Sequence, residues 1–454
     1  MSLSAALDFA RASHDRILAE LKDFLAIPSI STLSAHQPDM LRAAEWVAAQ
    51  MRGLHLDDVQ ILPTGGHPAV YGESLRAPGR PTVLLYGHYD VQPVDPLNEW
   101  HSGPFAGEIR GENIYARGAS DMKGQVLAFL KALEGLQQGG GLPINVKILI
   151  EGEEEIGSPS LGKLIAGNLD RLRCDVVLNA DSGILRPDLP SIVYGLRGLA
   201  YFELRVQGAA HDLHSGTYGG TVHNPLQVLC ELIAGMHDAD GRVTLPGYYD
   251  RVRVLSDAER AAIARSPYGD ADVLAATGAP RLYGETGYTT IERRGARPTL
   301  EVNGLLGGFT GEGAKTVLPA RAMAKISMRL VPDQEPAAVA GQLRAYLQQH
   351  APTTVTWELS QITSGPAIII ERDSPHMRAA EAALSAVFGK APIFVLEGGS
   401  VPVVSLLKKQ LDVDSIMLGF GLPDDNLHAP NEKLHLPTFF RGIDTYIHFF
   451  SGLG

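Results

Sequence analysis

The sequence predicts an α/β fold that is interrupted by an inserted α+β domain. Three observations support this prediction: apolar runs alternate with helical patterns up to about residue 190, alternating polarity replaces them from about residue 193, and the first pattern returns after about residue 370. Strands buried on both faces are continuously apolar, whereas strands with one covered face alternate in polarity. We therefore expect one domain from 1–193 and 369–454 and an inserted domain from 194–368.

The strands expected in the first domain are short apolar runs bounded by turn residues. They are TVLLYG (82–87), INVKILI (144–150), CDVVLNA (174–180) and, after the insertion, a strand at 414–419. The helices expected there share helical spacing of apolar residues, and they cover 5–26, 39–53, 122–136 and 374–389. Because a helix separates the first two strands, the order is β-α-β, and the sheet is expected to be largely parallel.

The inserted domain is expected to contain antiparallel strands with one covered face. The stretches SIVYGLRGLAYFELRVQG (191–208) and AMAKISMRLVP (322–332) alternate in side-chain character, as such strands do. Helical patterns at about 223–236 and 335–349 accompany them.

Length and composition narrow the class of protein. A chain of 454 residues that is 45% hydrophobic and 20% charged is globular and long enough for two domains. Its net charge of −12 disfavours nucleic acid and anionic membrane as partners. Charges interrupt the N-terminal apolar pattern, and no apolar stretch reaches the ~18–20 residues that span a bilayer. We expect a cytoplasmic protein with two free core thiols, so any metal must be held by His and carboxylates.

Candidate chemical groups follow the strands, where ligands bind in open α/β sheets. They are His88 and Asp90 after 82–87, the acidic stretch EGEEE (151–155), Asp121 at the start of a helix, Asp181 after 174–180 and His428 after 414–419. Each alone has an ordinary explanation: an ion pair, an acidic loop, a helix cap, a turn residue or a loop histidine. Together they match the nitrogen and oxygen ligands of Zn²⁺ or Mn²⁺, and two cations would cancel the repulsion among the carboxylates. One carboxylate left off the metals could serve as a base for a bound water.

Five motifs occur in the order seen in one known family. They are GHYDVQP, ARGASDMKGQ, EGEEEIGS, NADSG and DDNLHAPNEKL, and they span residues 87–434. The chain thereby resembles the co-catalytic di-zinc metallopeptidases, which include aminoacylase, carnosinase and cytosolic non-specific dipeptidase, succinyl-diaminopimelate desuccinylase and glutamate carboxypeptidase. The resemblance implies a three-layer, phosphorylase/hydrolase-like catalytic domain and a ferredoxin-like inserted domain that acts as a lid and dimerisation domain. DLHSGTYGG, RPTLEVNGL and EGGSVP favour the carnosinase-like branch.

The resemblance also implies roles for residues of the catalytic domain. Asp121 resembles the carboxylate that bridges both metals. The remaining ligands would be His88 and Asp181 for one ion, and Glu155 and His428 for the other. Asp90 resembles the partner that orients His88. Glu154 resembles the general base, which passes a proton from the attacking water to the leaving amine, and a cis Asp121–Met122 bond is expected.

Further implied residues lie in the second half of the chain. His214 resembles a histidine that enters the active site of the partner subunit and stabilises the oxyanion, with His211 as the competing candidate. Substrate binding is implied for Thr316, Arg329, Gly399 and Ser400, with Arg329 and Ser400 on the free carboxylate. For Arg329 the alternative is a salt-bridged strand residue that faces solvent.

We therefore expect a homodimeric metal-dependent amide hydrolase with two divalent ions per subunit. Zn²⁺ is the first expectation, with Mn²⁺ or Co²⁺ as alternatives. A dipeptidase is the leading hypothesis. The alternatives are an N-acyl-amino-acid deacylase of the acetylornithine deacetylase or desuccinylase type, an inactive metal-binding interaction protein, and a metal-free glycosidase that uses a carboxylate pair.

Overall fold

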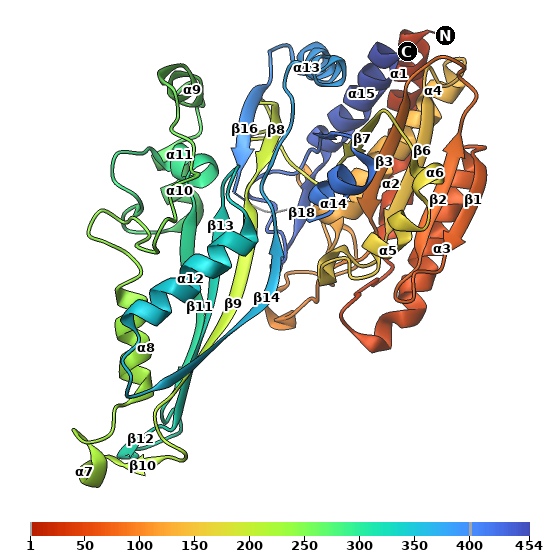
Figure 1. Cartoon of the computed structure of the whole chain (residues 1–454). Coiled ribbons are helices and arrows are strands. Elements are labelled where there is room, and N and C mark those ends of the chain that lie inside the picture. The colour runs from red at the N-terminus through yellow and green to blue at the C-terminus, as the bar shows by residue number, and fades with distance from the viewer. Residues whose placement is uncertain (1, 399–401) are drawn as a thin grey trace. The chain divides into compact units, whose positions relative to one another are not determined.

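The computed structural model describes residues 2–398 and 402–454 (Figure 1). The chain divides into two compact units: unit 1 holds 2–194, 370–395 and 402–454, and unit 2 holds 195–369 and 396–398. These divisions fall one residue after each boundary expected from the sequence. Residues 396–398 join unit 2 rather than the first domain because Arg197 contacts them, through its backbone N–H to Glu397 O (3.3 Å) and its Nε to Gly398 O (3.1 Å).

Unit 1 is built on a mixed sheet of order β1-β2-β6-β3-β7-β17-β8, in which β16 also pairs with β8. The end of β8 belongs to unit 2, where it pairs with β15. The bounds of these strands are β1 Asp57–Leu62, β2 Ala69–Ser74, β3 Thr82–His88, β6 Asn145–Glu151, β7 Val176–Asn179, β8 Ser191–Leu196, β15 Ile368–Ile369, β16 Ile393–Glu397 and β17 Ser415–Met417. The four strands β6, β3, β7 and β17 are parallel, and the pairs that flank them are antiparallel. The expected parallel sheet is therefore its central part.

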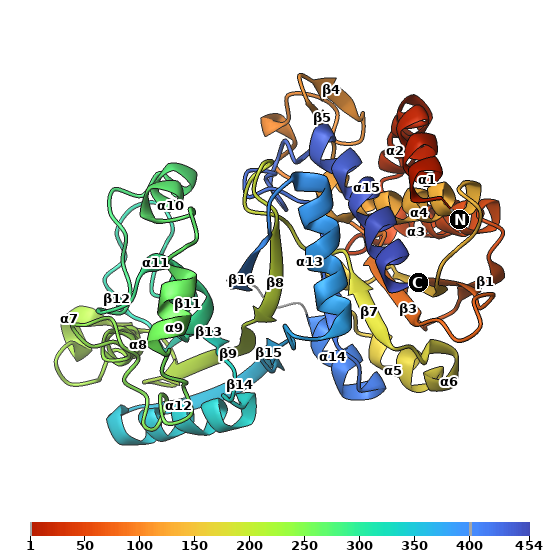
Figure 2. The same cartoon turned by 90° about the horizontal axis from the view of Figure 1, so that it is seen from above.

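Helices cover this sheet. They are α1 Leu3–Ala12, α2 His14–Leu25, α3 Gln37–Gly53, α4 Gly124–Gln138, α5 Leu161–Ala166, α6 Leu169–Leu172, α13 Pro375–Phe388, α14 Pro402–Leu411 and α15 Leu436–Leu453. α15 packs between α4 and α13 (Figures 1 and 2), α3 packs on β1 and β2 (Figure 1), and α14 packs on β17. The helix expected at 5–26 is two helices, because Ser13 leaves helical geometry at φ −96° and ψ 5°. A small sheet of β4 Glu108–Arg110, β5 Asn113–Tyr115 and β18 Lys433–His435 completes the unit.

Close packing positions the end of β3. Its residues Val83 to Tyr86 are fully buried, as the continuous apolar run predicts. At Gly87 a Cβ atom would come within 2.8 Å of the Val126 side chain on α4. Glycine therefore lets α4 approach the strand one residue before His88.

Unit 2 has the order β-α-β-β-α-β around an antiparallel sheet of order β11-β13-β9-β14, which is the ferredoxin-like arrangement. Its elements are β9 Gly198–Gln207, β10 Leu213–His214, α7 Ser215–Tyr218, α8 Pro225–Ala234, α9 Asp257–Ile263, α10 Asp270–Thr277, α11 Thr290–Ala296, β11 Thr299–Gly307, β12 Val317–Leu318, β13 Arg321–Leu330, α12 Pro336–His350 and β14 Thr356–Gly365. Alternate residues of β9 and β13 are buried against α8 and α12. The alternating polarity in the sequence thus reflects a sheet that is covered by helices on one face.

Two smaller expectations have different outcomes. The peptide bond between Asp121 and Met122 is cis, as expected. Both cysteines are free, but Cys230 is exposed and Cys174 only half-buried, so the expectation of core thiols is wrong.

Within the described residues, no helix is long and apolar enough to cross a membrane.

Candidate metal centre

The parallel strands of unit 1 bring the predicted ligands to one edge of the sheet. β3 ends at His88, β6 ends at Glu151 just before the acidic turn, and β7 ends two residues before Asp181. The loop after β17 carries His428. Carboxyl ends of parallel strands meet at one edge, so side chains that are distant in sequence become neighbours.

Five side chains form two groups that share one carboxylate. The first group is His88, Asp121 and Asp181, and the second is Asp121, Glu155 and His428, with one ligand atom from each member within 4.8 Å of the others in its group. His88 Nε2 lies 3.1 Å from Asp121 Oδ1, and His428 Nε2 lies 2.9 Å from Asp121 Oδ2. Each oxygen of Asp121 therefore faces a different imidazole, which is the arrangement of a carboxylate between two cation sites.

The donor atoms fit divalent ions in chemistry and in spacing. Zn²⁺ binds His nitrogen and carboxylate oxygen at about 2.0–2.2 Å, which places neighbouring atoms of a tetrahedral site about 3.3–3.6 Å apart. The imidazole contacts with Asp121 measure 3.1 and 2.9 Å, and His428 Nε2 lies 3.2 Å from Glu155 Oε2. If the donor atoms moved apart by a few tenths of an ångström, each group would therefore accept a divalent ion.

Asp90 is fully buried and supports both the histidine and the acidic turn. Its Oδ1 lies 3.3 Å from His88 Nδ1 and accepts the backbone N–H of Glu154 at 3.2 Å. Its Oδ2 accepts the backbone N–H of Glu155 at 3.1 Å. A carboxylate behind a metal-binding histidine fixes the orientation of the ring. Here the same carboxylate also holds the backbone of two candidate site residues.

Gln92 is a site residue that sequence reasoning missed. Its amide donates to the Oε2 of Glu155 at 2.8 Å and to the backbone carbonyl of Glu155 at 3.3 Å. The residue belongs to the motif GHYDVQP, so the motif contained the signal. Gln92 fixes the carboxylate of Glu155 beside His428.

Burial and crowding shift the pKa values of the acidic groups. Burial raises the pKa of Glu154 to about 9, and the carboxylates of Asp181 and Glu155 add to this rise. Burial and the charge of Asp121 raise the pKa of Asp181 to about 7. Positive charge favours the ionised form of a carboxylate, so divalent ions at this edge would lower both pKa values again.

The pKa values of the two histidines also rise, but hydrogen bonds to carboxylates rather than burial cause the rise. Burial would lower the pKa of His88, but hydrogen bonds to Asp121 and Asp90 raise it well above its usual value. Hydrogen bonds to Asp121 and Glu155 raise the pKa of the half-exposed His428 to about 10. Protons therefore stabilise this cluster, and a metal ion would supply the same positive charge.

The remaining acidic residues of the turn have structural partners. Glu151 Oε1 accepts the hydroxyls of Tyr86 at 2.6 Å and Ser158 at 2.9 Å. Glu153 accepts the backbone N–H groups of His67 at 2.9 Å and Ser160 at 3.0 Å. The four carboxylates of EGEEE thus divide into two that hold the turn and two that face the candidate metal centre.

The residues predicted in the inserted domain belong to unit 2. His214 is exposed on β10, where its Nδ1 accepts the backbone N–H of Gly216 at 3.0 Å. Thr316 lies beside it, because its carbonyl accepts the N–H of Ser215 at 3.0 Å. Arg329 is on β13, and burial lowers its pKa. Gly399 and Ser400 lie outside the described residues.

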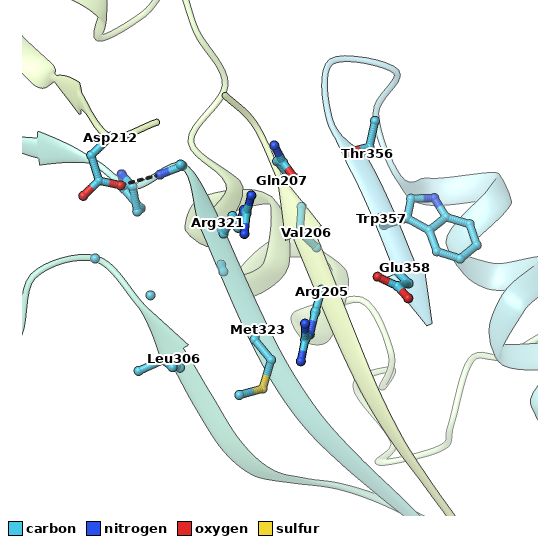
Figure 3. A pocket seen from close by; sticks show the side chains of 15 residues that line it. Arg205, Val206, Gln207, Asp212, Leu306, Arg321, Met323, Thr356, Trp357 and Glu358 are labelled. Carbon is cyan, nitrogen blue, oxygen red and sulfur yellow. Dashed lines mark hydrogen bonds between the residues drawn. The ribbon is translucent and has the colours of Figure 1, made fainter. Parts of the chain in front are cut away.

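Unit 2 also has a groove of about 760 Å³ on its sheet. Figure 3 shows Arg205 and Gln207 of β9 and Met323 of β13 along it, with Asp212 at one end accepting the backbone N–H of Ala320 at 2.9 Å. None of the predicted site residues is among the described residues that line it.

A two-unit α/β fold that brings paired His–carboxylate groups to one edge of a sheet is typical of a metal-dependent hydrolase. The model of Peptidase family M20/M25/M40 matches residues 84–451, and the chain belongs to this family and is a metallopeptidase. The Cys-Gly metallodipeptidase dug1 of Schizosaccharomyces pombe is 32% identical over 99% of this chain and 98% of that protein.

Solved structures agree with this assignment. The M20 family metallo-carboxypeptidase Sso-CP2 from Sulfolobus solfataricus has a TM-score of 0.86 and 34% identity over 96% of this chain and 99% of that one. Human carnosine dipeptidase 1 has a TM-score of 0.82 and 28% identity over 100% and 99% of the two chains.

Proposed function

We propose that the chain is a dipeptidase that binds two divalent ions through His88 and Asp181, Glu155 and His428, and the shared Asp121. The main support for this proposal is that the two carboxylate oxygens of Asp121 face two different histidines. Two ions bound there would act as Lewis acids toward the scissile carbonyl and the attacking water. Zn²⁺ fits the donors, with Mn²⁺ or Co²⁺ as alternatives.

Glu154 is the proposed general base. It lies next to Glu155 in sequence but belongs to neither donor group. The hydrogen bond from its backbone to Asp90 fixes the turn on which it lies. In this position its carboxylate accepts a proton from the attacking water and delivers it to the leaving amine. Asp90 keeps the ring of His88 oriented throughout.

Unit 2 would supply the substrate-binding groups. Arg329 is a cation suited to a free carboxylate, and we propose that it holds the C-terminus of the peptide together with Ser400, Gly399 and Thr316. His214 would stabilise the oxyanion in the partner subunit of a homodimer. Two free thiols support a cytoplasmic location.

The substrate is a short peptide in this proposal because relatives over the full length are named dipeptidases. The name metallo-carboxypeptidase of the Sulfolobus protein favours a second candidate, the removal of C-terminal residues from longer peptides. An N-acyl-amino-acid deacylase would use the same groups on a different acyl part.

Hydrolysis rates separate these activities. The Zn²⁺-loaded chain is incubated with an Xaa-Gly dipeptide, a longer peptide that ends in the same residues, and the matching acetyl amino acid. We expect the highest kcat/KM for the dipeptide. Preference for the longer peptide or for the acetyl compound contradicts the dipeptidase proposal.

A variant tests the role of the base. Glu154→Gln keeps the size of the side chain but cannot accept the proton, so turnover should fall by about 10²–10⁴-fold. Bound metal, measured by elemental analysis, should stay at the wild-type level. Unchanged turnover would show that another group is the base.

A further inference from the structure

Glu432 is a buried carboxylate that none of the roles above uses. Its side chain is 1% exposed, and it lies four residues after His428. The hydrogen bonds of its side chain are with residues 117–121, more than 300 positions earlier in the chain. We call residues 117–121 the Asp121 turn and residues 425–432 the His428 loop.

Both oxygens of Glu432 bind the Asp121 turn. Oε1 accepts the backbone N–H groups of Ser120 and Asp121, each at 3.1 Å. Oε2 accepts the backbone N–H of Gly118 at 2.9 Å and Nη1 of Arg117 at 2.8 Å. A carboxylate offers about four acceptor sites, so these four donors use its full capacity. A glutamine amide would present its own N–H groups to two of them.

A second carboxylate holds the other end of the His428 loop. Asp425 is fully buried, and its Oδ2 accepts the hydroxyl of Ser120 at 2.6 Å and the backbone N–H of Leu422 at 2.8 Å. Its Oδ1 binds Lys433 Nζ at 3.1 Å. Both ends of the loop that carries His428 are therefore attached to the turn that carries Asp121.

The backbone between these attachments is unfavourable. His428 has φ 62°, and Asn426 and Asn431 have φ 54° and 62°. Non-glycine residues rarely adopt left-handed conformations, which persist only where the surroundings impose them. The anchors at Asp425 and Glu432 flank these three residues, and between the anchors His428 Nε2 lies 2.9 Å from Asp121 Oδ2.

We propose that Glu432 is a positioning residue for the metal centre: it sets the position of Asp121 relative to His428, so that the shared carboxylate and the second histidine bind the same ion. This inference rests on the proposed metal-binding function. It assigns to Glu432 a role that a buried ion pair with Arg117 would not have by itself, because three of its four donors are backbone groups of the Asp121 turn.

Unit 2 offers a matched control. Glu285 is 5% exposed and binds Nε and Nη2 of Arg297, each at 2.7 Å. It is therefore also a buried glutamate paired with an arginine, but it contacts none of the candidate ligands among the described residues. Glu285→Gln measures what the loss of such a pair does to the fold alone.

The experiment compares the full-length wild type, Glu432→Gln and Glu285→Gln. For each protein, Zn²⁺ affinity is measured by competition with a chromogenic chelator, the visible spectrum is recorded with Co²⁺, and the thermal midpoint is measured without metal. We expect both variants to lose thermal stability. Glu432→Gln should bind Zn²⁺ at least about tenfold more weakly and show an altered Co²⁺ spectrum, whereas Glu285→Gln should match the wild type in both.

Wild-type Zn²⁺ affinity and Co²⁺ spectrum in Glu432→Gln would overturn the inference. If that variant does not fold, Ser120→Ala decides, since it removes only the hydroxyl bound to Asp425. A loss of affinity of about threefold or more supports the attachment of loop to turn, and any smaller loss overturns it. A wild-type chain that binds metal but cleaves no dipeptide contradicts the proposed function alone, and one that binds no metal contradicts both.

Discussion

Replacement of Asp90 by asparagine tests how the buried carboxylate supports the metal centre. Asp90 accepts two backbone N–H groups, from Glu154 and Glu155, and its Oδ1 faces His88 Nδ1 at 3.3 Å. An amide has one acceptor oxygen, so one of these part-buried backbone donors loses its side-chain partner. An unsatisfied buried donor costs about 1–3 kcal/mol. The amide also removes the negative charge behind His88.

The expected magnitude follows from these two losses. Replacing the outer partner of a metal-binding histidine weakens metal affinity by about 10–100-fold, and each factor of ten corresponds to about 1.4 kcal/mol. Asp90→Asn should therefore lower both the Zn²⁺ affinity by one to two orders of magnitude and the free energy of unfolding of the metal-free protein by about 1–3 kcal/mol.

The assay is a competition titration with Zn²⁺ together with urea unfolding of the metal-free protein. Asp444→Asn is the control, because Asp444 also accepts two N–H groups, from Nε and Nη2 of Arg11, but lies on α15 away from the strand ends. The control should bind Zn²⁺ like the wild type. A Zn²⁺ affinity of Asp90→Asn within threefold of the wild type would show that Asp90 does not support metal binding.

Three further predictions test other parts of the account. Treatment with a strong chelator should abolish peptide hydrolysis, and Zn²⁺, Mn²⁺ or Co²⁺ should restore it; full activity after complete removal of metal would contradict a metal-dependent mechanism. His214→Ala should lower kcat by about 10²–10³-fold while metal content is unchanged. If the histidine acts in the partner subunit, mixing this variant with Glu154→Gln should restore up to about a quarter of the wild-type activity. No recovery would place the histidine in the active site of its own subunit. Phe202→Ala, in the core of unit 2, should lower the free energy of unfolding of that unit by about 3–5 kcal/mol in urea. Zn²⁺ affinity should be unchanged, because all five proposed ligands lie in unit 1, and a loss of affinity would contradict that assignment of the ligands.

The strands and the candidate ligands could be predicted because their signals are local. Continuous apolar runs mark β3, β6 and β7, and the end of each run indicates where a side chain such as His88 or Asp181 reaches the sheet edge. The alternation along β9 and β13 similarly predicts one covered face. These patterns depend on a few neighbouring residues, and so they can be read from the chain alone.

Other features depend on contacts that leave no local pattern. Glu432 binds a turn more than 300 residues away, and nothing in its own neighbourhood indicates this. Glu151 and Glu153 look like Glu154 and Glu155 in sequence, but their partners are Tyr86 and the backbone of His67. The attachment of residues 396–398 to unit 2 is likewise set by distant hydrogen bonds, from Arg197 to Glu397 and Gly398.

A crystal structure of the Zn²⁺-loaded chain, with anomalous diffraction data at the zinc edge, tests whether Asp121 joins two metal sites. We predict two peaks in each subunit, about 3.5–4 Å apart, with one oxygen of Asp121 bound to each ion. His88 and Asp181 should bind one ion, and Glu155 and His428 the other. A single peak, or two peaks that Asp121 does not bridge, would contradict this prediction.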